Sequence, residues 1–130
     1  MAFTVINGSI PVQPGVQAYN MIASGNITKG QGVYLAGDDK VKVPVDSGQK
    51  LFGISDGTVS DGDVVSIYGP LNLVQAKLSG SVDAGTLVGL HADGYLANST
   101  YVKYETGAMV TKGVGSTGNG EVIILGCTSL

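Results

Sequence analysis

The sequence predicts an all-β protein with many short strands, arranged as a barrel or a sandwich. Short apolar or alternating runs are separated by turn residues, and glycine alone supplies 21 of the 130 residues. No stretch shows the 3.6-residue period of an amphipathic helix. The chain also repeats itself, because Ser24–Gly30 returns as Ser79–Gly85 and Val33–Asp38 returns as Val88–Asp93. We therefore expect a fold built from an internal duplication of about 55 residues.

An extended, apolar N-terminal arm is expected to precede the duplicated part. Residues 1–18 lie outside the repeat, and their prolines and glycines break any long strand or helix. Apolar side chains in such an arm should not remain free in water, so the arm either forms a first edge strand or reaches another subunit. The candidate contact residues of the arm are Phe3, Val5, Ile6, Ile10, Val12 and Val16.

Residues 19–130 are expected to form a single β domain, in keeping with their length. Repeat one covers residues 19–69 and repeat two covers residues 74–126. The last segments of the repeats match at a larger offset, since Asp61–Val65 resembles Asn119–Ile123, and three inserted residues would reconcile the two offsets. Two copies are too few for a solenoid, so they should form either one barrel or two packed lobes.

In repeat one, the pattern predicts five short strands. They are expected at Tyr19–Ala23, Gly32–Ala36, Lys40–Val43, Leu51–Ile54 and Val64–Tyr68. Lys40–Val43 alternates polar and apolar residues, as a half-buried antiparallel strand does. The turn before it is marked by Gly37–Asp39, which has the residue types that turns prefer.

The pattern of repeat two predicts five short strands in the same order as in repeat one. They are expected at Val74–Leu78, Val88–Leu90, Tyr95–Ala97, Ala108–Val110 and Val122–Leu125. Asp93 and Gly94 between two apolar runs are a strong hairpin signal, because glycine accepts a positive φ without a Cβ clash. The consecutive apolar residues of Val122–Leu125 predict a strand that is buried on both faces. Thr100–Thr106, rich in Thr and Tyr, is a candidate extra strand.

The composition argues against several classes of function. The net charge is −3, and the basic residues are scattered, so binding to nucleic acid through phosphate contacts is not expected. Charged residues make up only 13% of the chain, which indicates a surface partly covered by partners. The start lacks the features of a signal peptide, and no apolar run approaches the length that spans a bilayer. We therefore expect a protein made in a cytoplasm, without a membrane partner.

Candidate catalytic or metal-binding residues are few. Cys127 has no partner for an intrachain disulfide and is interpreted as an apolar strand residue, and His91 has no second ligand for a zinc site. Asp61 and Asp63 flank a glycine as calcium ligands sometimes do, but a solvated turn is the preferred interpretation. Gly113–Gly118 matches the dinucleotide fingerprint, yet a strand is expected after it where the motif needs a helix. We expect no catalytic residue, no metal, no cofactor and no enzymatic activity.

The order of glycines and apolar residues carries a resemblance. Its parts are a Gly-x-Ile-x-x-Gly-x-x-Val strand, an Asp/Gly hairpin, an apolar-Gly-Ile strand and a closing Gly/Val strand, much of it repeated. In the first round these are Gly25, Ile27, Gly30, Val33, Gly37, Asp38, Phe52, Gly53, Ile54, Gly62 and Val64, with Ser66 in place of the usual valine. In the second round they are Gly80, Val82, Gly85, Val88, Asp93, Gly94, Met109, Val110, Gly120, Val122 and Ile124. Over about residues 19–126, the chain resembles small bacteriophage capsid decoration, or head cement, proteins.

The resemblance implies a structural virion protein that binds the outside of an assembled phage head and bridges major capsid subunits. Such proteins are commonly homotrimers on the outer capsid surface, made in the cytoplasm of the bacterial host. The implied partner is the phage major capsid protein. One trimer that touches several capsid subunits gains avidity, and an extended arm can add a strand to an exposed sheet edge.

Two other functions stay open. The chain can be a carbohydrate- or receptor-binding β domain of a phage tail or surface structure, although it has no Trp and its six Tyr are spread along the sequence. Binding to glycans would favour that alternative. A small enzyme would need a constellation of polar residues that the sequence does not offer.

Overall fold

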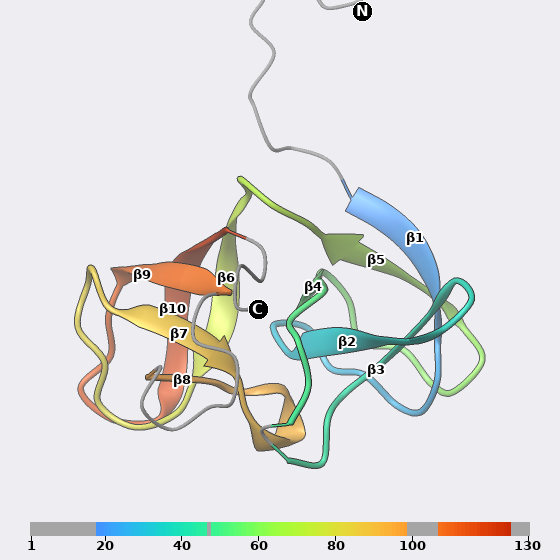
Figure 1. Ribbon diagram of the computed structural model, residues 1–130, viewed down its shortest axis with the longest axis horizontal. Coiled ribbons are helices and arrows are strands. Elements are labelled where there is room, and N and C mark those ends of the chain that lie inside the picture. The colour runs from blue at the N-terminus through green and yellow to red at the C-terminus, as the bar shows by residue number, and fades with distance from the viewer. Residues whose placement is uncertain (1–17, 47, 99–106, 126–130) are drawn as a thin grey trace, which may run out of the picture.

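Each repeat folds into its own β-barrel, and the two barrels lie side by side in the computed structural model (Figure 1). The structure describes residues 18–46, 48–98 and 107–125. The all-β class and the internal duplication are confirmed, and the two repeats form two barrels instead of one. Residues 1–17 of the predicted arm, the candidate strand Thr100–Thr106 and Cys127 lie outside the described residues, whereas Ala18, the last residue of the predicted arm, begins strand β1.

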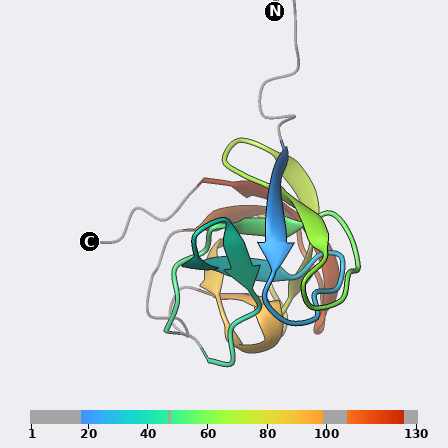
Figure 2. The ribbon, with the colours of Figure 1, turned by 90° about the vertical axis from the view of Figure 1, so that its right-hand side faces the viewer.

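Barrel one contains the first five strands. They are β1 (Ala18–Ala23), β2 (Gly32–Gly37), β3 (Lys40–Lys42), β4 (Gly53–Ser55) and β5 (Val64–Tyr68). The order around the barrel is β1-β3-β2-β4-β5, and β5 pairs with β1 to close it. β1 and β3 run parallel, whereas the other pairs are antiparallel. Figure 2 shows this barrel in front, with β1, in blue, running down the face nearest the viewer.

Barrel two repeats this arrangement strand by strand. It contains β6 (Leu73–Leu78), β7 (Leu87–Leu90), β8 (Leu96–Asn98), β9 (Ala108–Lys112) and β10 (Gly118–Ile124). A 3₁₀ turn, η1 (Ala92–Gly94), joins β7 to β8 at the predicted hairpin. β6 and β8 are the parallel pair, and β10 pairs with β6 to close the barrel. The common topology, including one parallel pair in each barrel, shows that the duplication covers the whole unit.

One offset of 55 positions relates the two barrels throughout, so the predicted three-residue insertion is wrong. In barrel one, Met21 of β1 pairs with Val65 of β5. In barrel two, Ala76 of β6 pairs with Gly120 of β10. Each of these residues lies 55 positions from its counterpart, and the isolated bridges near the start of each barrel keep the same offset.

The error arose from two similar sequences that have different structures. Asp61–Asp63 forms a turn before β5, whereas the similar Asn119–Glu121 lies inside β10. Asp-Gly-Asp and Asn-Gly-Glu were matched because glycine and acidic residues are common in turns. In β10 the same residue types are tolerated within a strand, so the local match does not reflect the alignment of the barrels.

The last strand is buried on one face only, which corrects the prediction of burial on both. Val122 and Ile124 are fully buried, Ile123 is half-buried and Leu125 is exposed. A strand in a barrel wall points alternate side chains into the barrel and away from it. The apolar outward residues of β10 therefore lie on the outer surface of barrel two.

The two barrels have connected but distinct cores. Among the described residues, the buried core of barrel one consists of repeat-one residues: Met21, Ala23, Ile27, Val33, Val41, Val65 and Ile67. The core of barrel two includes Leu51 and Ile54 of repeat one among its buried residues. Barrel two is thus completed by side chains from barrel one, and apolar packing holds the barrels together.

A short connection, Gly69–Asn72, joins the two barrels and is held by hydrogen bonds. Asn72 is buried and donates from Nδ2 to the Gly69 carbonyl oxygen at 3.0 Å. The Leu71 amide donates to the Ile124 carbonyl at 2.6 Å, and the Ile124 amide donates to the Asn72 carbonyl at 3.0 Å. Leu71 has a φ of 70°, which is uncommon for a residue with a Cβ atom.

Candidate interaction surfaces

The arm residues predicted to contact a capsid lie before the described part of the chain. This applies to Phe3, Val5, Ile6, Ile10, Val12 and Val16. The described residues instead present two apolar surfaces that the sequence did not point to. Both are best understood from the contact between the barrels.

The mouth of barrel two, formed by Val74, Leu90, Asp93 and Gly107, is closed by barrel one. Val74 is 7% exposed and Leu90 is 1% exposed, although both lie at the end of the barrel. Leu51 of barrel one lies over Gly107, where a Cβ atom would come within 2.8 Å of Leu51 Cδ2. Only a residue without a side chain allows this close approach.

The surface that closes this mouth belongs to the outer row of barrel one, which runs Ala18, Tyr68, Ile54 and Gly32; Ile54, Tyr68 and Gly32 pack on barrel two, and Ala18 at the end of the row is exposed. These residues are cross-strand neighbours, since Ala18 and Ile54 both pair with Tyr68, and Gly32 pairs with Ile54. Ile54 is fully buried within the core of barrel two. A Cβ atom on Gly32 would lie 2.6 Å from Leu90 Cδ1, so the outer row packs directly on the mouth.

Hydrogen bonds to backbone carbonyls connect the two barrels. The Asp93 amide donates to the Pro44 carbonyl at 2.9 Å, and Gln31 Nε2 donates to the Asp93 carbonyl at 2.8 Å. The Lys77 amide donates to the Gly30 carbonyl at 3.0 Å. Together with the apolar packing of Leu51, Ile54 and Gly32 on barrel two, these bonds lead us to expect that the barrels move as one body.

The mouth of barrel one, formed by Tyr19, Leu35, Asp38 and Phe52, is open. Leu35 is 53% exposed and Tyr19 is 44% exposed. With Met21 and neighbouring hairpin residues, they line a hollow of about 570 Å³. The rings of Tyr19 and Phe52 have centroids 6.2 Å apart and planes inclined by 52°, as aromatic neighbours often do.

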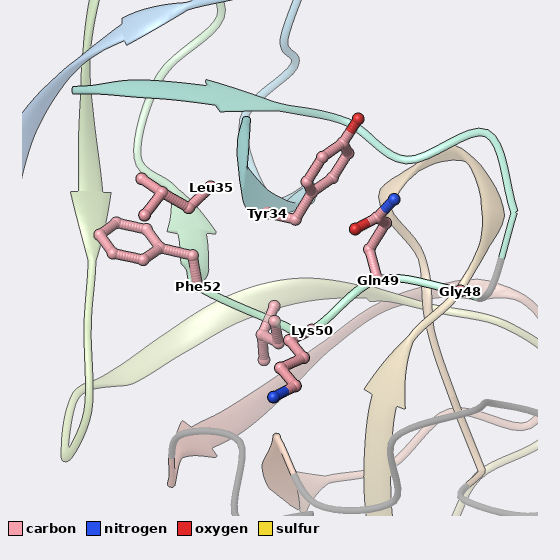
Figure 3. Close-up of a pocket in the computed structure, with 7 residues that line it drawn as sticks. Tyr34, Leu35, Gly48, Gln49, Lys50 and Phe52 are labelled. Atoms are coloured by element: carbon pink, nitrogen blue, oxygen red, sulfur yellow. The ribbon is translucent and has the colours of Figure 1, made fainter. Parts of the chain in front are cut away.

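A second hollow, of about 390 Å³, adjoins this mouth (Figure 3). Its lining is formed by Tyr34, Leu35 and the segment Gly48–Phe52. Leu35 and Phe52 lie side by side and border both hollows. The two hollows therefore adjoin at Leu35 and Phe52, and the second one reaches Leu51 at the contact with barrel two.

The outer row of barrel two, formed by Leu73, Ile123, Met109 and Leu87, is also uncovered. Leu73 pairs with Ile123, Ile123 with Met109, and Met109 with Leu87, so the row crosses four strands. Leu73 is 61% exposed and Met109 is 36% exposed, while the other two are half-buried. A row of apolar side chains on an outer strand face is typical of a contact surface.

Asp61 and Asp63 accept hydrogen bonds from backbone amides in and beside the turn before β5. Asp61 Oδ1 accepts a hydrogen bond from the Gly25 amide at 2.7 Å, and Asp63 Oδ2 accepts one from the Ser60 amide at 3.1 Å. Both aspartates are exposed in the turn before β5. Among the residues that the structure describes, no group of three or more His, Cys, Asp or Glu side chains is arranged to hold a metal ion.

His91 and the glycine-rich loop have structural roles. His91 is half-buried at the start of η1, and its Nδ1 accepts a hydrogen bond from the Ala92 amide at 2.7 Å. Gly113–Gly118 connects β9 to β10, and Val114 within it forms a bridge to Val82. The prediction that a strand, not a helix, follows this loop is confirmed.

Tyr68, in the outer row of barrel one, has a perturbed hydroxyl. Burial raises its pKa, and the charge of the neighbouring Asp56 carboxylate, to which the hydroxyl donates a hydrogen bond, raises it further. Both causes favour the protonated form. Tyr68 therefore remains a neutral hydrogen-bond donor beside the contact between the barrels at neutral pH.

Within the described ranges, no helix has the length and apolar character needed to cross a membrane. Comparison of the sequence with protein-family models and with curated proteins finds no match. Among solved structures, the chain is similar to the N base of the head fiber protein gp8.5 of bacteriophage phi29. The TM-score is 0.62 at 17% sequence identity, and the match covers 83% of this chain and 92% of that chain. The two proteins share a fold.

Proposed function

We propose that this chain is a structural virion protein of a bacteriophage, without enzymatic activity, that binds the outside of the head. In this function it bridges major capsid subunits as a homotrimer and stabilises the shell. The observation that carries the proposal is the shared fold, which extends over nearly the whole of the head fiber base. The sequence resemblance to capsid decoration proteins points independently to the same place in a virion.

The uncovered apolar surfaces support this proposal. The mouth of barrel one and the outer row of barrel two present large apolar side chains to solvent. Such surfaces are typical of proteins that work within an assembly. A trimer bound at several points gains avidity, because later contacts form within the complex.

The test is co-sedimentation of the purified full chain with phage heads that lack it. We expect saturation at a copy number that the symmetry of the head permits. Bound protein should also raise the temperature at which the heads release DNA, because bridging adds contacts that must break. The same heads mixed with an unrelated β protein of similar size are the control. If the chain stays in the supernatant at micromolar concentration, the proposal is wrong.

A second candidate function has one observation in its favour. Tyr19, Tyr34 and Phe52 line the two hollows of barrel one, and small-molecule sites are commonly concave with apolar and aromatic linings. A carbohydrate- or receptor-binding domain would use this surface. A glycan array with the wild-type chain and the Tyr19→Ala variant tests it. Binding that depends on Tyr19, together with no binding to heads, would favour this function.

A further inference from the structure

The contact between the two barrels uses surfaces that the duplication supplies twice. The outer row of barrel one closes the mouth of barrel two within the chain. The residues named for these two surfaces have counterparts 55 positions away in the other barrel, and those that lie in strands keep the same register. Leu51, which also packs on Gly107, corresponds to Thr106, outside the described residues. Within the described part of the chain, one mouth and one outer row therefore have no equivalent partner: the mouth of barrel one and the outer row of barrel two.

Residues 55 positions apart differ sharply in burial, because one of each pair lies in the contact between the barrels and the other does not. Leu90 in the closed mouth is 1% exposed, whereas its counterpart Leu35 in the open mouth is 53% exposed. Ile54 in the covered outer row is fully buried, whereas its counterpart Met109 is 36% exposed. Leu35 and Leu90 are both leucine, and Ile54 and Met109 are both large apolar residues, although one member of each pair is buried and the other is exposed. Both free surfaces thus keep the apolar character of the surfaces that are used.

We propose that the outer row of barrel two of one copy packs on the mouth of barrel one of a second copy. The contact between copies would repeat the contact between barrels within a copy. Because the two surfaces are different, the association is head-to-tail, and it closes into a ring or continues as a filament according to the rotation between copies. The occupant of both surfaces is therefore this chain itself.

The side chains predict a less intimate contact between copies than within one. Within a copy, Gly32 and Gly107 allow close approach of the barrels. At the proposed contact their places are taken by Leu87 and Phe52, which are larger. The contact between copies should bury these side chains against each other and keep the barrels farther apart. We expect an association that is reversible on dilution, unlike the fixed contact within the chain.

This inference deepens the proposed function, because it names the surfaces through which copies would join in the trimer, but its test needs no phage head. The molar mass of the full chain is measured by light scattering during size-exclusion chromatography over a concentration series. Leu35→Asp disables the mouth, and Met109→Asp disables the outer row, since a carboxylate buried in an apolar contact is costly. We expect each variant to be a monomer of about 13.1 kDa, while the wild type is a multiple of that mass.

Mixing the two variants identifies the head-to-tail arrangement. Leu35→Asp keeps an intact outer row, and Met109→Asp keeps an intact mouth, so one productive contact can form between them. We expect the mixture to give a heterodimer and no larger species. Val64→Asp is the matched control, because Val64 is 62% exposed on β5 and belongs to neither surface, and it should assemble like the wild type.

Several outcomes would overturn the inference. These are a wild type that is monomeric at all concentrations, variants that keep the wild-type mass, or folded variants that remain monomers when mixed. If deletion of residues 2–16 abolishes assembly while both point variants still assemble, the arm makes the contact instead. Circular dichroism establishes folding, and Tyr19→Asp and Leu73→Asp replace any variant that does not fold. If the chain assembles but does not bind phage heads, this inference stands and the proposed function is wrong.

Discussion

Gly53 occupies a position in β4 at which a side chain would collide with the neighbouring strand. A Cβ atom there would overlap the Tyr68 carbonyl oxygen and lie 2.5 Å from Ile67 Cγ2. Because a backbone carbonyl in a closed barrel cannot move aside, we expect Gly53→Ala to reduce the free energy of unfolding by about 1–3 kcal/mol. Urea denaturation followed by circular dichroism measures the effect. Gly57→Ala is the control, since a Cβ there meets nothing within 4 Å, and equal stability of the two variants would contradict the prediction.

The hydroxyl of Tyr68 predicts a dependence of stability on alkaline pH. Its pKa in the folded state is raised above the usual 10.0 by burial and by Asp56, so the folded protein holds this proton more tightly than the unfolded chain. The resulting stabilisation is fully present below pH 10 and is lost as the pH rises through the folded pKa. Absorbance titration of the tyrosines should show a late component that Tyr68→Phe removes and Asp56→Asn moves to lower pH. Titration of the wild type without a late component would refute this.

At the scale of single residues, the sequence predicts turns but not exposure. Asp93 and Gly94 were recognised as hairpin residues, and both have positive φ, because a tight turn depends on local backbone freedom. The open mouth was missed for the opposite reason. Leu35 and Leu90 have the same residue type in the same pattern, and only the packing of one barrel on the other makes one exposed and the other buried. A comparison of the two repeats, with the question of which copy is covered, is the signal that could have revealed it.

Elements were predicted well where the pattern is local, and poorly where it depends on distant pairing. All ten strands lie at or near predicted segments, since alternation and turn residues are read within a few positions. The sequence does not predict how each barrel closes, because β1 meets β5 across more than forty residues and no local pattern encodes that pairing. The three-residue insertion was wrong for the same reason. The match between Asp61–Val65 and Asn119–Ile123 was local, whereas the register of β5 and β10 is set by their partners.

The connection between the barrels contains a strained residue that can be improved. Leu71 is 59% exposed and has a φ of 70°, a conformation that costs a residue with a Cβ atom about 1–2 kcal/mol. Asparagine tolerates this conformation better, so Leu71→Asn should raise the free energy of unfolding by roughly 0.5–1 kcal/mol. The midpoint of urea denaturation measures the gain. Leu71→Ala keeps the strain and serves as the control; a midpoint for Leu71→Asn no higher than that for Leu71→Ala would show that strain is not the cause.

At the scale of the whole molecule, we expect the barrels to fold without the arm, and the arm to contribute to binding. The core of barrel one is complete within the described residues, so deletion of residues 2–16 should leave the melting temperature nearly unchanged. Under the proposed function, the same deletion should sharply reduce binding to phage heads, because an extended arm can add a strand to a sheet edge of the capsid. A matched variant has serine in place of Phe3, Val5, Ile6, Ile10, Val12 and Val16. Undiminished binding by both variants would remove the arm from the interaction.

The unequal division of the two cores has a consequence for synthesis on the ribosome. The described residues in the core of barrel one all belong to repeat one, so this barrel can close as soon as Tyr68 has left the exit tunnel. Barrel two requires Leu51 and Ile54, which belong to the half already translated. Since chains are made from the N-terminus at several residues per second, the first half can be folded before the second is complete. Leu51 and Ile54 are then already in place when barrel two folds and packs on them. The order of translation therefore matches the order in which the two cores can form.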